Sequence, residues 1–116
     1  MIVLVCGGRD YQNYSRVSEV LNAIHYKTPI SLIVHGAAQG ADSLAEMWAD
    51  EHVVPNTKDK HQAQWRLYGR MAGPIRNHEM LATHKISLVV AFPGGSGTAD
   101  MLKKARAAHI PIEVIS

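Results

Sequence analysis

Short apolar runs alternate with segments of helical periodicity along the chain. Continuous apolar runs are typical of parallel strands buried on both faces, and apolar residues at i, i+3, i+4 and i+7 are typical of helices with one buried face. The pattern predicts five strands, at 1–6, 31–35, 53–54, 86–92 and 111–115. It also predicts four helices, at 15–26, 41–52, 74–84 and 97–109, and it leaves 56–69 as a loop or an irregular helix.

Alternating strands and helices predict a single α/β domain. Right-handed crossovers would place helices on both faces of the sheet, giving a three-layer sandwich with a mostly parallel five-stranded sheet in the order 3-2-1-4-5. In that order the winding reverses between the first and fourth strands, and ligands of open α/β sheets bind beyond the carboxyl ends of the strands at such a point. We therefore expect the loops 7–14, 36–42 and 93–98 to meet there.

The composition narrows the class of protein. The 116 residues, 47% apolar and 19% charged, suit one globular domain, and a net charge of +2 is too small for a general nucleic-acid or membrane surface. The single Cys6 excludes an internal disulfide and suits a reducing compartment. No apolar stretch approaches the ~20 residues of a membrane span, and Met1 opens a strand-like run rather than a signal sequence. We expect a cytoplasmic protein without membrane association.

The most specific motif is P-G-G-S-G-T, which joins the predicted strand 86–92 to the predicted helix 97–109. Its three glycines permit positive φ and remove the Cβ atoms that would keep an anion from the backbone N–H groups. The helix that follows would present unpaired N–H groups and the positive end of its dipole to the same place. Either the glycines only reverse the chain, or they bind phosphate, and we predict a phosphate loop made of Pro93, Gly94, Gly95, Ser96, Gly97 and Thr98.

Two other predicted strands also end in glycine-rich loops. In the first loop Arg9 could hold a phosphate through its planar guanidinium group, or it could pair with Asp10. In the second loop Asp42 could accept hydrogen bonds from ribose hydroxyls, or it could only stabilise the start of a helix. The ligand contacts that we expect from the two loops are Gly7, Gly8, Arg9, Asp10, Gly36, Gln39, Gly40 and Asp42.

Arginines alternate with aromatic residues over 65–77. Arg76 would lie in the first turn after Pro74, where the helix dipole disfavours a cation, so an anionic ligand would explain its place. We expect Arg76 and Asn77 to contact the ligand. Trp65 and Tyr68 could stack on a base, although packing roles are commoner for such residues.

The histidines do not predict a metal site. The chain has seven of them, but it contains neither H-E-x-x-H nor C-x-x-C. His78 and His84 lie six residues apart and would face different ways on a helix. We therefore expect neither a metal nor another cofactor.

Four motifs, in order along the chain, resemble the SLOG superfamily, and most closely its small YspA-like members (domain of unknown function 2493). They are C-G-G-R-D-Y, H-G-A-A-Q-G-A-D, G-P-I-R-N and A-F-P-G-G-S-G-T-A-D. The superfamily includes the LOG phosphoribohydrolases, the DNA-processing protein DprA, and sensor domains regarded as binding nucleotides or nucleotide-derived signals. The resemblance implies a Rossmann-like fold with a nucleotide site at the motif loops. Related proteins are often dimers, so it also implies a homodimer or a higher homo-oligomer.

The resemblance leaves the chemistry open. LOG enzymes cleave the N-glycosidic bond of a nucleoside monophosphate with an arginine and a glutamate, to which Arg76 and Asp100 correspond by position. The chain reads T-A-D where LOG enzymes have T-x-E-E, so the acid is one methylene shorter and Met101 replaces the second carboxylate. We expect binding of a nucleotide or nucleotide derivative without turnover, as a sensor or carrier. The alternatives are a LOG-like phosphoribohydrolase that uses Arg76 and Asp100, and a DprA-like nucleic-acid module, which the small net charge disfavours.

Overall fold

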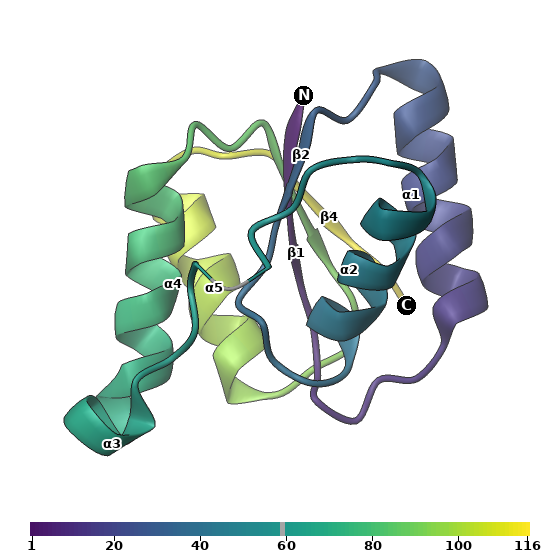
Figure 1. Cartoon of the computed structure of the whole chain (residues 1–116). Helices are drawn as coiled ribbons and strands as arrows, with labels where there is room; N and C mark the ends of the chain where they lie inside the picture. The colour runs from purple at the N-terminus through teal and green to yellow at the C-terminus, as the bar shows by residue number, and fades with distance from the viewer. Residues whose placement is uncertain (59) are drawn as a thin grey trace.

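A parallel sheet forms the centre of the molecule, and helices cover both of its faces (Figure 1). The computed structural model describes residues 1–58 and 60–116. Within these residues the sheet has four strands in the order β2-β1-β3-β4, and all neighbouring strands are parallel. The strands are β1 (Ile2–Cys6), β2 (Leu32–Val34), β3 (Leu88–Ala91) and β4 (Ile112–Val114).

Successive side chains of β1 pack on opposite faces of the sheet. Val3 and Val5 belong to the core beneath the helices α1 (Tyr14–Lys27) and α2 (Ala41–Glu51). Leu4 and Cys6 belong to the core beneath α4 (Ala72–Thr83) and α5 (Ser96–Ala107). This alternation follows from the two-residue period of a strand, and both faces are buried, as expected of a parallel sheet. A short helix, α3 (Trp65–Tyr68), lies before α4, and the 3-10 helix η1 (Gly69–Met71) joins the two.

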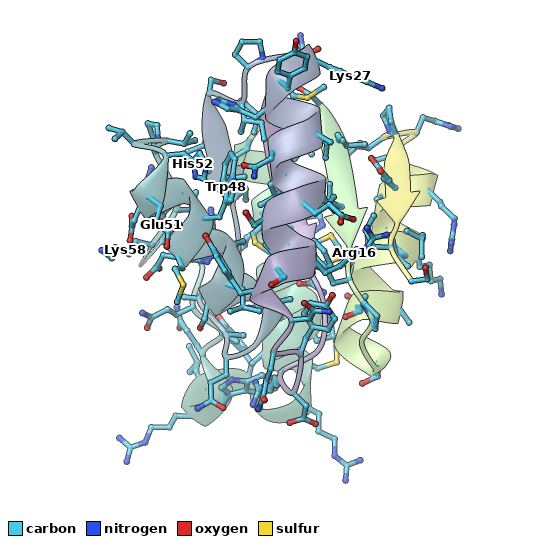
Figure 2. The ribbon with its side chains drawn as sticks, turned by 90° about the vertical axis from the view of Figure 1, so that its right-hand side faces the viewer. Arg16, Lys27, Trp48, Glu51, His52 and Lys58 are labelled. Carbon is cyan, nitrogen blue, oxygen red and sulfur yellow. The ribbon has the colours of Figure 1, made fainter. Side chains whose placement is uncertain are left out.

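Trp48 fixes the packing of α2 against α1. Its side chain is fully buried, and its indole N–H donates to the side chain of Asn22 on α1 at 2.9 Å. The ring of His52 stacks on the indole with the two centroids 4.3 Å apart, and Figure 2 shows the two side chains beside α1. The buried residues of α2 include Ala41, Ala45 and Trp48, which are spaced as on one face of a helix.

The predicted strand at 53–54 is wrong, and with it the five-stranded order 3-2-1-4-5. Val53 is 90% exposed and has a φ of 54°, because the chain turns sharply after α2. In the described residues, one isolated parallel bridge, between Ile33 and Asn56, forms on the side of β2 where the strand was expected to pair. The predicted order of the other strands is confirmed, so the winding reverses between β1 and β3.

The remaining elements begin or end within about two residues of their predicted bounds. The segment that the pattern left as a loop or irregular helix contains α3 and leads through η1 into α4. Since α4 begins at Ala72, Pro74 lies in its first turn, while Arg76 falls in the second turn rather than the first. None of the helices in the described ranges is long and apolar enough to cross a membrane.

Candidate functional site

The loops that follow β1, β2 and β3 touch one another beyond the carboxyl ends of these strands. The amide of Gly8 donates to the carbonyl of Pro93 at 2.8 Å, and the carbonyl of Gly8 accepts from the amide of Ala41 at 3.2 Å. A Cβ on Gly94 would lie 2.6 Å from the nitrogen of Gly8, and a Cβ on Gly40, whose φ is 78°, would collide with the carbonyl of Gly8. The glycines at these positions are thus required for the loops to approach one another.

The loops and α4 enclose a cavity of about 750 Å³. Most of the predicted site residues lie on its wall: Gly7, Gly8, Arg9, Asp42, Arg76, Asn77, Gly95, Ser96, Gly97, Thr98 and Asp100. The others lie behind the wall or outside it, and they are Asp10, Gly36, Gln39, Gly40, Pro93 and Gly94. Asp10, Gln39, Pro93 and Gly94 are exposed, and Gly36, Gly40, Pro93 and Gly94 shape the loops through close backbone contacts.

The first turn of α5 opens into this cavity without a capping side chain from the described part of the protein. Gly95 is the N-cap residue, no described side chain forms a cap hydrogen bond with the helix, and no acidic residue lies in the first turn. The first amide that bonds to the cap carbonyl is that of Ala99, at 3.0 Å. The preceding amides therefore have no intrahelical acceptor and point outward from the N-terminus, which is the arrangement that binds phosphate in many proteins.

The glycines of the loop 93–98 do not use the positive φ that they permit. In the described residues the glycines with positive φ are Gly40 and Gly69. A Cβ on Gly95 or on Gly97 would have no atom within 4 Å, so both Cα atoms face open space at the cavity. Only Gly94 is required for packing, and the other two leave the backbone accessible.

Arg76 reaches across the cavity from α4. Its Nε–H donates to the side chain of Asn77 at 3.0 Å, and an Nη–H donates to the carbonyl of Gly36 at 2.8 Å. In the part of the chain that the structure describes, no carboxylate forms an ion pair with it. Burial lowers the pKa of the guanidinium group, with the nearby charge of Asp42 opposing the effect. A partly buried cation without an ion pair at a cavity wall is suited to an anionic ligand.

Asp42 lies in the first turn of α2, and it also has a structural role that the sequence did not suggest. Its Oδ2 accepts hydrogen bonds from the amides of Gly36 at 3.0 Å and Ala38 at 3.3 Å, so the carboxylate holds the loop that precedes α2. Burial raises the pKa of this carboxyl group, while the charges of Arg76 and His35 and the two amide bonds oppose the shift. For Asp42, the cost of burying the charged carboxylate therefore exceeds the stabilisation of that charge by its partners.

Asp100 is the centre of a short polar network. The amide nitrogen of the Asn77 side chain donates to its Oδ2 at 3.0 Å, and the ammonium group of Lys104 lies 2.6 and 2.7 Å from its two oxygens. Burial alone would raise the pKa of Asp100, but the hydrogen bonds from Lys104 and Asn77 outweigh it and hold that pKa below its usual value. The carboxylate of Asp100 is thus ionised, its negative charge is balanced by Lys104, and its position is fixed by these hydrogen bonds.

Arginine and tryptophan side chains surround the mouth of the cavity. The guanidinium carbon of Arg9 lies over the ring of Trp65, 5.3 Å from its centroid, and the alternative pairing of Arg9 with Asp10 does not form in the described residues. Arg70 lies on the same wall. The sequence offered Trp65 as a residue that could stack on a base and placed Arg70 in the arginine-rich segment 65–77, but neither was among the predicted ligand contacts. It missed Cys6 and Met80, although the position of Cys6 directly before Gly7 was a signal for it.

Comparison with known proteins agrees with the motifs. The chain matches the family described as "YspA, cpYpsA-related SLOG family" over residues 1–68, a range that includes the loops after β1 and β2. It is also 34% identical over 116 residues to the Gene 61 protein of Mycobacterium phage D29, and this similarity covers 95% of the chain and 92% of the phage protein. The resemblance read from the four motifs is thereby confirmed, and the chain belongs to the YspA, cpYpsA-related SLOG family.

Proposed function

We propose that this protein binds a nucleotide or a nucleotide-derived ligand and acts as a sensor or carrier. The observation that carries the proposal is the shared cavity, which is lined both by the N-terminus of α5, uncapped by any described side chain, and by the guanidinium group of Arg76, which forms no ion pair among the described residues. Both groups favour an anion, and phosphate is among the anions that helix N-termini bind. The phosphate would lie on the backbone of 95–98.

The size of the cavity supports a ligand larger than phosphate alone. About 750 Å³ falls within the range of roughly 300–1,000 Å³ that is usual for small-molecule sites. Arg9 and Arg70 add positive charge near the mouth, and Asn77 and Asp100 add hydrogen-bonding groups deeper in the wall. A nucleoside phosphate combines the negative charge and the polar sugar that such a wall would recognise.

The network around Asp100 favours binding without turnover. A phosphoribohydrolase needs a carboxylate that can stabilise the positive sugar centre or transfer a proton. Both oxygens of Asp100 already accept bonds from Lys104, and Asn77 donates to one of them. Since the charge is neutralised by Lys104 and the pKa is lowered, this carboxylate is a weak base. The LOG-like activity is therefore the second candidate, supported by the location of Arg76 and Asp100 in the same cavity.

A thermal-shift panel tests the proposal. The purified protein is heated with AMP, ADP, ATP, NAD, ADP-ribose and cyclic nucleotides, and each mixture is afterwards analysed by liquid chromatography. A ligand that binds only the folded state raises the melting temperature. We expect at least one nucleotide to do so and to be recovered intact. A released base would establish the phosphoribohydrolase instead, and the absence of any shift would overturn the proposal.

Matched arginine variants show whether the shift comes from this cavity. Arg76→Gln removes the charge at the cavity wall, whereas Arg106→Gln removes an exposed charge from the last turn of α5. The ligand-induced shift should be lost only in Arg76→Gln. Single-stranded DNA serves as a further probe, since tight, salt-dependent binding of DNA would favour the nucleic-acid module.

The homo-oligomer remains part of the proposal. Sedimentation velocity over a range of protein concentrations, with and without the stabilising nucleotide, measures it directly. If the protein is a monomer under all these conditions, the proposal of a homo-oligomer is wrong, whereas the proposed ligand site is unaffected.

A further inference from the structure

The short helix α3 exposes aromatic and apolar side chains beside the cavity. None of its four residues is buried, and Trp65 is 48% exposed. A tryptophan buries a large apolar area when it has a packing role, so a half-exposed indole at a cavity mouth needs another explanation. Tyr68, at the other end of α3, is exposed to a similar degree but does not line the cavity.

The ring of Trp65 is held in position from two sides. A Cβ placed on Gly73 would lie 3.4 Å from Cη2 of the indole, so the ring rests against the backbone at the start of α4. The guanidinium group of Arg9 lies over the ring at 5.3 Å from its centroid. The ring is therefore oriented, and a planar, electron-poor group already occupies the space over its face.

We propose that Trp65 is the platform on which the base of the bound nucleotide stacks. This inference rests on the proposed nucleotide binding, because the phosphate on α5 fixes one end of the ligand and Trp65 then meets the other end. A base is planar like the guanidinium group, so it can take the place of Arg9 over the indole. The exposed Arg9 side chain, released from the ring, is free to pair with the ligand phosphate. The ligand class is thus a nucleotide with an intact base, rather than a sugar phosphate.

Stacking on an aromatic side chain gives a measurable contribution to affinity. Removal of such a ring weakens the binding of a base by roughly tenfold to a hundredfold. The same removal should leave the binding of ribose 5-phosphate unchanged, because this compound has no base. Trp65→Leu should therefore bind a nucleoside monophosphate about as weakly as ribose 5-phosphate, and Trp65→Phe should retain most of the difference.

Calorimetric titration with AMP, GMP, CMP, UMP and ribose 5-phosphate tests this inference. The wild type, Trp65→Leu, Trp65→Phe and the control Tyr68→Leu are compared, and the control should bind as the wild type does. If Trp65→Leu binds the nucleotides as tightly as the wild type, Trp65 is not the platform, although the proposed nucleotide binding stands. If the wild type binds neither the nucleotides nor ribose 5-phosphate, both proposals fall.

Fluorescence gives a second readout that does not depend on a variant. The protein has two tryptophans, and Trp48 is fully buried in the core between α1 and α2 (Figure 2). A base stacked on Trp65 should quench the emission of the exposed indole, and ribose 5-phosphate should not. Equal quenching by both ligands would contradict stacking at Trp65.

Discussion

The backbone of Gly94 lies directly against the backbone of Gly8. A Cβ on Gly94 would be 2.6 Å from the nitrogen of Gly8, and it would also collide with the hydroxyl of Thr98. The same nitrogen donates to the carbonyl of Pro93 at 2.8 Å. The loops after β1 and β3 are therefore joined at a point where no side chain fits, and this point supports the wall of the cavity.

Gly94→Ala should separate these two loops. Relief of the collision requires a backbone shift, which costs roughly 1–3 kcal/mol of the free energy of unfolding. Urea denaturation measures this loss, and the nucleotide-induced thermal shift should weaken with it. Gly97→Ala is the matched control, because a Cβ there meets no atom within 4 Å and alanine favours a helix by up to ~1 kcal/mol over glycine. Equal stability of the two variants would contradict this account.

Arg76 should stabilise the loop after β2 as well as the ligand. In Arg76→Met the buried carbonyl of Gly36 loses its donor, which costs about 1–3 kcal/mol, and Asp42 loses a positive charge that lowers its pKa. We expect a less stable protein in which the pKa of Asp42 has risen further above its ordinary value. Carboxyl chemical shifts followed against pH measure that pKa, with Arg106→Met as the control. An unchanged pKa in Arg76→Met would show that Arg76 and Asp42 are not coupled.

Most of the fold could be predicted because parallel strands buried on both faces appear as continuous apolar runs. The runs at β1 and β3 are unmistakable, and right-handed crossovers then restrict the strand order. The pair Val53 and Val54 looked like the visible part of a strand for the same reason. Only Val54 reaches the core, because the turn after α2 directs Val53 into solvent. A two-residue run cannot reveal such a turn.

The meeting point of the three loops could be predicted, but the contacts of the side chains in the candidate site could not. Sheet topology alone brings the loops after β1, β2 and β3 together. The restraint on Asp100 depends on Lys104, one helical turn away, which the sequence reading did not connect with it. The place of Trp65 over the cavity depends on α3, whose four residues are too few to give a helical period.

A pair of histidines, 23 positions apart in the sequence, predicts a pH dependence of stability. The Nε2 atoms of His61 and His84 lie 2.8 Å apart, and His61 is only 5% exposed. Burial lowers the pKa of both side chains, and the pKa of His61 is lowered further by His84, with Glu79 opposing. Because both pKa values are lower in the folded state, the unfolded state binds more protons as the pH falls below about 6.5. The stability should therefore be full above that pH and decrease below it.

Urea denaturation between pH 8 and pH 5 measures this decrease. His84→Gln should reduce the loss of stability at low pH. The neutral amide can still form a hydrogen bond with His61, but it does not take up a proton. His78→Gln, which changes an exposed residue of α4, should leave the wild-type profile unchanged. If His84→Gln and the wild type lose the same stability between pH 6.5 and pH 5, the histidine pair is not the source of the dependence.

Cys6 should be unreactive in the folded protein although it borders the cavity. Burial raises the pKa of its thiol to about 12, the carboxylate of Asp42 adds to the shift, and Arg76 opposes it. At pH 8 only about one thiol in ten thousand would then be ionised, and the thiolate is the form that reacts. Iodoacetamide labelling followed by mass spectrometry should show slow modification at pH 8 and fast modification in urea. Because Arg76 favours the thiolate, Arg76→Met should slow the native reaction further. Fast labelling of the folded wild type would instead mean that the thiol is ionised and accessible from the cavity.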